Sequence, residues 1–146
     1  MRTIIQRVNR ASVLIDGKEK NETGKGLMVL CAFEEEDNKE KIEYVANKIV
    51  NLRIFTDEND KLNLSALDIK GEILIVSNFT LYGNCDKGRR PCFNRAAKPE
   101  ISEQMYNEFV NEVKKYGLTV KTGKFGADML VDIQNDGPVT VMVESK

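Results

Sequence analysis

Histidine is absent from this chain of 146 residues. Its absence excludes Ser-His-Asp and Cys-His catalysis within one chain, together with zinc sites that need histidine ligands. A homodimer would not restore this chemistry, because both copies would lack the residue. Any catalysis must therefore rely on other side chains, on the backbone or on the substrate itself.

Cysteines and long apolar runs are also scarce. The 3 cysteines, Cys31, Cys85 and Cys92, are an odd number and form no CxxC pair, which predicts a reduced cytoplasmic chain rather than a disulfide framework. Cys85 and Cys92 lack the further ligands of a metal site, so we expect neither a metal nor a cofactor. The longest apolar run, Leu27–Phe33, is far shorter than the ~18 residues of a membrane span. We also expect no signal peptide and no membrane association.

Charge is nearly balanced along the chain as a whole. With 22 basic and 23 acidic residues, the net charge of -1 argues against a general polyanion-binding protein. One segment departs from this balance and is called the basic segment below. It is Lys87–Lys98, which contains no acid but the basic residues Lys87, Arg89, Arg90, Arg95 and Lys98. A solvated loop is one interpretation. The other is contact with a phosphate backbone, which arginine can bind through paired hydrogen bonds.

Short segments that are rich in β-branched and aromatic residues predict strands. These segments are Thr3–Val8, Ser12–Ile15, Lys25–Phe33, Arg53–Phe55, Glu72–Ser77, Thr119–Lys121, Met129–Ile133 and Val139–Val143. The near-continuous apolar run within Lys25–Phe33 predicts a central strand that is buried on both faces.

Two further segments have the apolar spacing of amphipathic helices. We expect a capping box from Asp37 to Glu40 before the first helix, and Pro99 in the first turn of the second. Many strands with two separated helices predict an α+β fold, and the length predicts one domain over residues 1–146. The apolar stripes are Ile42, Val45, Ala46 and Ile49 in the first helix, and Ile101, Met105, Phe109 and Val113 in the second.

The segment SNFTL, Ser77–Leu81, follows the predicted strand Glu72–Ser77. Polar side chains at a strand end can face a cleft instead of the core. Ser77 and Thr80 supply hydroxyls, Asn78 supplies an amide, and Phe79 supplies an apolar wall. The alternative is that these hydroxyls only satisfy nearby backbone groups where the strand ends.

The segment NDGPVT, Asn135–Thr140, lies between two predicted strands. Asp136-Gly137 alone would predict a hairpin turn, but Pro138 cannot donate a hydrogen bond to a strand ladder. One interpretation is a hairpin loop with a trans proline, since only about one X-Pro bond in twenty is cis. The other is a backbone device, in which a cis Gly137-Pro138 bond turns two carbonyl groups to one side to accept hydrogen bonds from an ammonium group.

Taken in order along the chain, these stretches resemble the D-aminoacyl-tRNA deacylases. The resemblance is nearly end to end and includes QRV, ASV, KGL, LRIF, NLS, EILIVS, NFTL, KGRRP, GKFGADM and NDGPVT. It implies a compact domain with a mostly antiparallel, barrel-like sheet and two main helices. It also implies a homodimer, with active sites at the subunit interface and a cis Gly137-Pro138 bond that reaches into the partner subunit's pocket.

The family has two signature segments, Ser-Gln-Phe-Thr-Leu and Asn-x-Gly-Pro-Val-Thr. This chain matches the second in full, but it has Asn78 in place of the glutamine of the first, a side chain shorter by one methylene. The resemblance implies that the chain hydrolyses the ester that joins a D-amino acid, or glycine mischarged on tRNA(Ala), to the 3′-terminal adenosine of tRNA. The implied site residues are Ser77, Phe79 and Thr80 for catalysis, Asn78, Phe125, Met129, Gly137, Pro138, Val139 and Thr140 for the substrate, and Lys87, Arg89, Arg90 and Arg95 for tRNA.

Two mechanisms are open for this reaction. Thr80 could act as a nucleophile if a lysine or a carboxylate served as its base. We favour assistance by the substrate, in which a ribose hydroxyl orients or activates water while backbone donors near Phe79 and Thr80 stabilise the oxyanion. Three other functions compete: a non-catalytic RNA-binding module, a related deacylase of tRNA mischarged with L-alanine, and an esterase of small D-amino-acid esters. Phe79 and Val139 match the D-specific pattern better than the L-alanine pattern.

Overall fold

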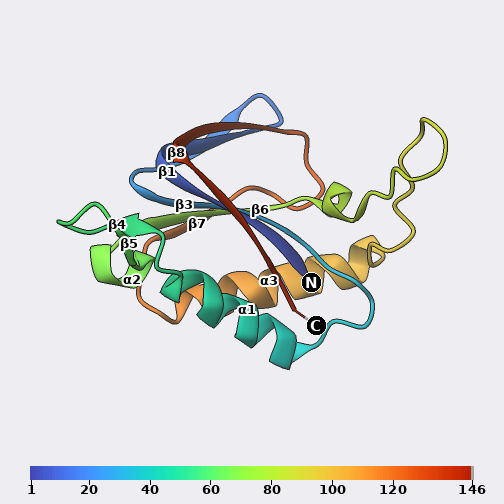
Figure 1. Cartoon of the computed structure of the whole chain (residues 1–146). Coiled ribbons are helices and arrows are strands. Elements are labelled where there is room, and N and C mark those ends of the chain that lie inside the picture. Colours follow the sequence, from blue (N-terminus) through green and yellow to red (C-terminus); the bar gives the residue numbers. More distant parts are fainter. Residues whose placement is uncertain (146) are drawn as a thin grey trace.

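The computed structural model describes residues 1–145, in which a strongly bent sheet has helices packed against one face (Figure 1). Lys146, the last residue of the predicted domain, lies outside the described residues. The strands are β1 (Arg2–Ile15), β2 (Glu19–Thr23), β3 (Gly26–Ala32), β4 (Phe55–Thr56), β5 (Leu62–Leu64), β6 (Glu72–Ser77), β7 (Val120–Thr122) and β8 (Met129–Glu144). The helices are α1 (Lys39–Asn51), α2 (Ala66–Ile69), α3 (Pro99–Lys114) and the short 3₁₀ helix η1 (Phe79–Tyr82).

The main sheet mixes antiparallel and parallel strand pairs. Strand β1 pairs antiparallel with β2, β3 and β8, whereas β3–β6 and β6–β7 are parallel pairs. Parallel neighbours need long crossover connections, and α1 and α3 lie within the connections that join these strands. The predicted α+β class, the barrel-like curvature and the two main helices are confirmed. The prediction of a mostly antiparallel sheet holds only for the strands that pair with β1.

Strands β3 and β6 form the buried centre of the fold. Leu27, Val29 and Ile75 are fully buried against the helices, while Met28 and Leu74 are fully buried on the opposite face, beneath β8. The apolar run in Lys25–Phe33 is therefore buried on both faces, as predicted. Because the two strands run parallel, with Cys31 paired to Ser77, their C-terminal ends meet at one edge of the sheet.

Helix α1 begins at a residue other than the one predicted. Its N-cap is Asn38, whose side chain accepts a hydrogen bond from the backbone N–H of Lys41 at 3.0 Å. Asp37 is buried instead, and its carboxylate accepts from the backbone N–H of Glu34 at 2.7 Å. The predicted capping box from Asp37 to Glu40 is wrong, because a contact in the preceding turn has already taken the Asp37 carboxylate.

Helix α3 has Pro99 in its first turn, as predicted. Phe109 and Val113 are fully buried, but Ile101 is 36% exposed and Ser102 is buried in its place. The buried face is thus turned slightly from the predicted stripe, because the docking of the helix on the sheet decides which side is covered. No helix within residues 1–145 is long and apolar enough to cross a membrane.

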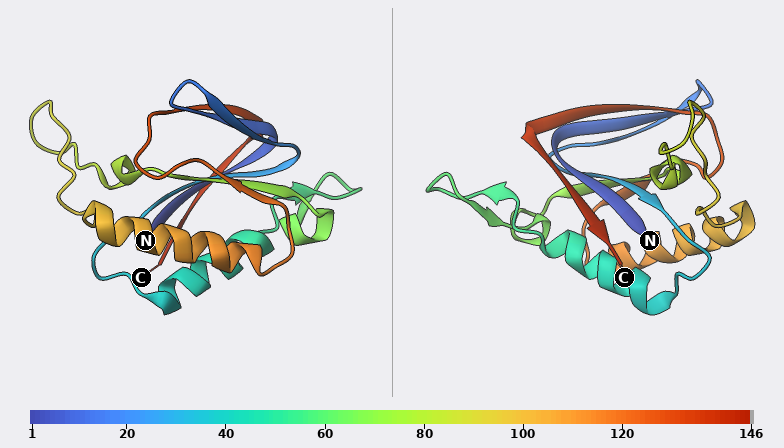
Figure 2. Two further views of the ribbon diagram at one scale, coloured as in Figure 1. Left: turned by 180° about the vertical axis from the view of Figure 1, so that it is seen from behind. Right: turned by 45° about the vertical axis from the view of Figure 1, so that its right-hand side comes forward.

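Strand β8 contains the NDGPVT segment in its middle. The residues before Asn135 pair along the C-terminal half of β1, and those from Thr140 onward pair along its N-terminal half. Residues 136–139 pair with nothing in β1 and bulge out where both strands bend (Figure 2). The hairpin interpretation is therefore wrong, since the chain does not reverse direction here. The Gly137-Pro138 bond is cis, as the family resemblance implies.

Candidate functional site

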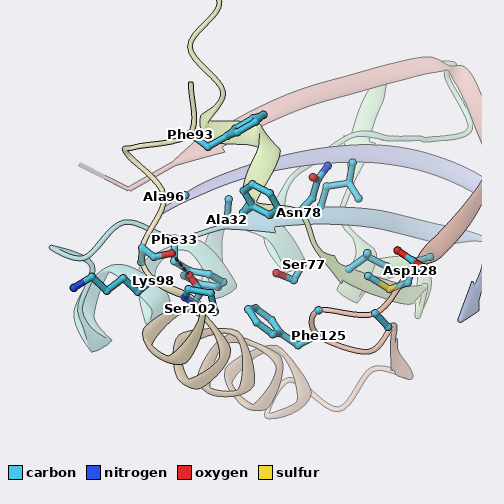
Figure 3. Close-up of a pocket in the computed structure, with 18 of the residues that line it drawn as sticks. Ala32, Phe33, Ser77, Asn78, Phe93, Ala96, Lys98, Ser102, Phe125 and Asp128 are labelled. Carbon is cyan, nitrogen blue, oxygen red and sulfur yellow. Dashed lines mark hydrogen bonds between the residues drawn. The ribbon is translucent and has the colours of Figure 1, made fainter. Parts of the chain in front are cut away.

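A cavity of about 720 Å³ opens where β6 ends, and it is called the main cavity below (Figure 3). Its walls come from segments that are far apart in the sequence and meet at this edge of the sheet. A largely apolar cavity with a few polar groups is the usual form of a small-ligand site. The lining includes Ser77, Asn78 and Phe79 after β6, Phe93, Ala96, Ala97 and Lys98 before α3, and Phe125, Gly126, Ala127, Asp128 and Met129 before β8.

The predicted site residues divide into two groups around this cavity. Ser77, Asn78, Phe79, Phe125 and Met129 all line it. Thr80 does not line it, but its hydroxyl donates a hydrogen bond to the side-chain oxygen of Asn78 at 2.5 Å. The structure thus brings five of the predicted site residues together around one cavity, and their roles stay a prediction.

Backbone donors are available at the start of η1. The N–H of Asn78 donates to the carbonyl of Cys31 at 2.8 Å, which ties this residue to the end of β3. The next two N–H groups, of Phe79 and Thr80, have no acceptor within residues 1–145, and the Asn78 side chain does not cap η1. Unpaired N–H groups at the first turn of a helix point away from it along its axis. Phe79 lines the main cavity and Thr80 is the next residue, so these two donors lie at its edge, and unpaired backbone donors suit a developing oxyanion.

The Thr80 hydroxyl has no base beside it. Within the part of the chain that the structure describes, its partner is the neutral amide of Asn78, and no lysine or carboxylate hydrogen-bonds to it. The nearby Cys31 thiol is fully buried, and burial raises its pKa far above the ordinary value. Neither group is therefore an activated nucleophile.

The Gly137-Pro138 bulge lies away from the cavity of its own chain. Gly137, Pro138 and Thr140 are exposed, Val139 is partly buried, and none of them lines the main cavity. Figures 1 and 2 show the bend of β8 at the opposite end of the sheet from η1. The structure therefore does not bring these predicted substrate-binding residues together with the SNFTL residues within one chain.

Side chains of β1 and of β8 itself fix the position of the bulge. Arg7 is buried, and its Nε lies 3.1 Å from a carboxylate oxygen of Asp136. Its Nη1 donates a hydrogen bond to the carbonyl of Ile54 at 2.9 Å. Asn135 donates from its amide to the Thr140 hydroxyl at 2.8 Å. The bulge is thus fixed to the body of the protein while its tip faces solvent.

The basic segment forms most of a loop that projects between η1 and α3 (Figure 1). Lys87, Arg89 and Arg90 are exposed and make no ion pair within residues 1–145. Arg95 differs, because it forms an ion pair with Glu34 at 2.7 Å and lies 5.2 Å from the centre of the Tyr82 ring. The hydrogen bond that Arg95 donates to the Glu34 carboxylate raises the pKa of Arg95, so the guanidinium stays charged.

The structure adds cavity residues that the sequence did not single out. Phe93 is one wall of the cavity. The one sequence feature that could have indicated it is an aromatic residue among basic ones. Asp128 also lines the cavity, with its backbone held by Asp16: the Asp16 N–H donates to the Asp128 carbonyl at 2.8 Å. The one sequence feature that could have indicated Asp128 is its position next to Met129 in the GKFGADM stretch. Both placements depend on long-range packing.

Comparisons with known proteins identify the family of the chain. A family model described as D-Tyr-tRNA(Tyr) deacylase matches residues 4–144. Proteins named D-aminoacyl-tRNA deacylase from Thermosipho africanus and Clostridium kluyveri are each 56% identical over 146 residues, which is 100% of this chain and 98% of theirs.

Solved structures with the same fold include a protein titled "c-Myc DNA Unwinding Element Binding Protein", with a TM-score of 0.92 and 44% identity over 100% of this chain and 99% of that one. A probable eukaryotic D-amino acid tRNA deacylase has a TM-score of 0.86 at 20% identity, over 98% of both chains. Because the family model and these relatives span nearly the whole chain, the chain belongs to the D-Tyr-tRNA(Tyr) deacylase family.

Proposed function

We propose that this chain hydrolyses the ester bond between a D-amino acid and the 3′-terminal adenosine of tRNA. The observation that carries the proposal is a cavity with unpaired backbone donors in a chain that is 56% identical, over its full length, to proteins named D-aminoacyl-tRNA deacylase. The products are a free D-amino acid and tRNA, so the reaction is a proofreading step for chirality.

Catalysis relies on the backbone and on the substrate. The ester carbonyl lies against the N–H groups of Phe79 and Thr80, which stabilise the negative charge that develops on its oxygen. One such donor contributes about 3 kcal/mol to the transition state in other hydrolases. Because Thr80 has no base, the attacking water is oriented by the neighbouring ribose hydroxyl of the terminal adenosine.

Chiral selection comes from a second copy of the chain. The Gly137-Pro138 bulge is fixed to the body, faces solvent and lies away from its own cavity. In a twofold homodimer each bulge enters the main cavity of the partner. There its carbonyl oxygens hold the α-ammonium group of the substrate. This orientation aims an L side chain at protein backbone but leaves room for a D side chain or for the hydrogen of glycine.

A second candidate function is nucleic-acid binding without catalysis. The unpaired cations of the basic segment, Lys87, Arg89 and Arg90, favour it. A structural relative at 44% identity also has a title that describes DNA-element binding. In our proposal the same cations instead bring the acceptor end of tRNA to the main cavity.

A deacylation assay distinguishes these functions. We expect cleavage of D-Tyr-tRNA and of Gly-tRNA(Ala), with L-Tyr-tRNA spared and a free D-tyrosine ester cleaved far more slowly. Binding of D-Tyr-tRNA without cleavage would support the binding module. Preferential cleavage of L-Ala-tRNA, or equal cleavage of the free ester, would support the other deacylase branch or a small-molecule esterase. The variant Ala96→Trp, which fills the main cavity, is the inactive control.

A further inference from the structure

A second cavity lies in the loop between η1 and α3 and has a volume of about 330 Å³. The proposed function assigns it no role. Its walls are polar or charged, apart from one thiol. The lining residues are Asn84, Asp86, Lys87, Cys92, Asn94 and Arg95.

One short segment, residues 92–94, lies between this second cavity and the main one. Cys92 is fixed against Asn84, because each donates its backbone N–H to the carbonyl of the other, at 2.8 Å and 2.9 Å. Phe93 lines the main cavity, across from Phe125 (Figure 3), while its two neighbours in the chain, Cys92 and Asn94, line the second.

The rim between the cavities carries an aromatic pair. The rings of Phe79 and Phe93 meet edge to face, with centroids 5.3 Å apart, and Phe79 is 55% exposed. Gly83 leaves room for this pair, because a β-carbon there would lie 2.9 Å from Cε1 of Phe93. An exposed aromatic ring beside basic groups is the platform on which unpaired nucleobases stack.

The charge around the second cavity favours an anion. Lys87 makes no ion pair within residues 1–145, and Arg95 stays charged in its ion pair with Glu34. Asp86 is the acid in the lining, and it is outnumbered by these cations and by the exposed Arg89 and Arg90 of the same loop. Lys87 is therefore free to pair with a phosphate.

We propose that the two cavities form one track for the unpaired 3′ end of tRNA. The inference rests on the proposed function and specifies how its substrate is held. The main cavity takes the terminal aminoacyl-adenosine, and the Phe79–Phe93 pair stacks on the base of the preceding nucleotide. The second cavity, through Lys87, binds a backbone phosphate of that nucleotide. Because any base has a π face, the track recognises an unpaired ribonucleotide segment without reading its sequence.

Two matched substrates test the track: 3′-O-D-tyrosyl-adenosine, and the D-tyrosyl ester of the trinucleotide CCA. For Phe93→Leu we expect kcat/KM on the trinucleotide ester to fall about tenfold, with recovery in Phe93→Tyr, because only the latter keeps a ring to stack on. For Lys87→Ala we expect a fall of about fivefold and a weaker dependence on salt. Lys87→Ala should cleave the nucleoside ester nearly as well as the unmodified protein, and Phe93→Leu should lose clearly less activity on the nucleoside ester than on the trinucleotide ester. Lys61→Ala, which changes an exposed lysine between β4 and β5 that lines neither cavity, is the control.

Equal losses on the two substrates would overturn the inference, because Phe93 would then be only a wall of the main cavity. Binding provides a readout that does not depend on cleavage. Uncharged CCA trinucleotide should bind more tightly than adenosine, and Phe93→Leu should remove most of the difference. No difference in the unmodified protein would overturn the track even if deacylation is found. Tighter binding of CCA without cleavage of either ester would instead overturn the proposed function and leave the track intact.

Discussion

The guanidinium of Arg7 lies directly behind Gly137, so that a β-carbon on Gly137 would come within 2.9 Å of Nη2 of Arg7. The same guanidinium contacts Asp136 through Nε at 3.1 Å. Arg7 comes from the bend of β1, opposite the four residues of β8 that leave the ladder. A buried cation thus fixes the position of a bulge whose tip faces solvent.

Gly137→Ala should impair selection without unfolding the protein. Gly137 has a φ of 117°, which L side chains rarely adopt, and an added β-carbon would also crowd Val139. The backbone strain should cost about 1–3 kcal/mol of stability. We also expect kcat/KM on D-Tyr-tRNA to fall at least about tenfold and exclusion of L-Tyr-tRNA to weaken, because carbonyl positions set the discrimination.

Gly117→Ala is the matched control for that variant. Gly117 also has a positive φ, of 83°, but nothing lies within 4 Å of an added β-carbon, and it follows the C-terminal end of α3, whose N-terminal end borders the main cavity. It should lose stability while keeping the activity and the D/L ratio of the unmodified protein. Deacylation assays with both esters and urea denaturation check these expectations. A normal D/L ratio in Gly137→Ala would contradict the assigned role of the bulge.

Arg7→Ala should destabilise the protein and reduce activity together. Arg7 is 8% exposed and also donates from Nη1 to Ile54 at 2.9 Å, so its loss leaves buried acceptors unpaired. We expect a loss of about 2–3 kcal/mol in urea denaturation, below the value for a fully buried pair because Asp136 is partly exposed. The control Arg10→Ala removes an exposed pair with Glu22 and should cost less than about 1 kcal/mol. If the two substitutions reduced stability and activity equally, the inference that Arg7 fixes the position of the bulge would be wrong.

Thr80→Val should retain most of the turnover. Its hydroxyl contacts only the neutral amide of Asn78, so it has no base to make it a nucleophile. The substitution keeps the backbone N–H that the mechanism uses. We expect kcat on D-Tyr-tRNA to fall less than about tenfold, since one neutral hydrogen bond contributes about 1 kcal/mol. A loss comparable to removal of a covalent nucleophile, about a thousandfold or more, would favour the Thr80 mechanism.

Stability should depend on Asp57 in acid. Hydrogen bonds from the backbone of Lys61 first, and then from Asn59 and Asn63, lower the pKa of this carboxyl below its usual 3.8. Because the folded pKa lies below the unfolded one, the contribution to stability is fully present above the unfolded value. It is lost as the pH falls through the folded value.

Thermal unfolding across this acidic range tests that dependence. Asp57→Asn should flatten the dependence of Tm on pH below the usual carboxyl pKa. Asp60→Asn changes an exposed carboxylate of the same turn that accepts no side-chain hydrogen bond within residues 1–145. It should leave the slope unchanged. Identical acid profiles for the unmodified protein and Asp57→Asn would show that the hydrogen bonds to Asp57 do not stabilise its charged form.

Local sequence patterns predicted the features that depend on neighbouring residues. The both-face burial of Leu27–Phe33, the position of Pro99 and the placement of Ser77 at a strand end are properties of short segments. The family resemblance then indicated Asn78, Phe125 and Met129 as parts of one site, and all three line the main cavity.

Features that depend on long-range packing were not predictable in this way. Asn135 and Thr140 both pair with β1, so the chain continues past the bulge in one direction. No local pattern in NDGPVT distinguishes this continuous strand from a hairpin. The Asp37 carboxylate accepts a hydrogen bond from the Glu34 N–H instead of capping α1. Ile101 is exposed because of the way in which α3 packs on the sheet. Phe93 becomes a cavity wall only through the bridge between Asn84 and Cys92.

Complementation between two inactive variants tests most directly the claim that one protomer completes the site of the other. Ala96→Trp fills the main cavity but keeps the bulge, and Gly137→Val disables the bulge but keeps the cavity. After the two are mixed, unfolded and refolded together, we expect D-Tyr-tRNA deacylation to return to about a quarter of the unmodified level, since each mixed dimer regains one intact site. A mixture that stays as inactive as its components would contradict the account, because cavity and bulge would then have to act within the same chain.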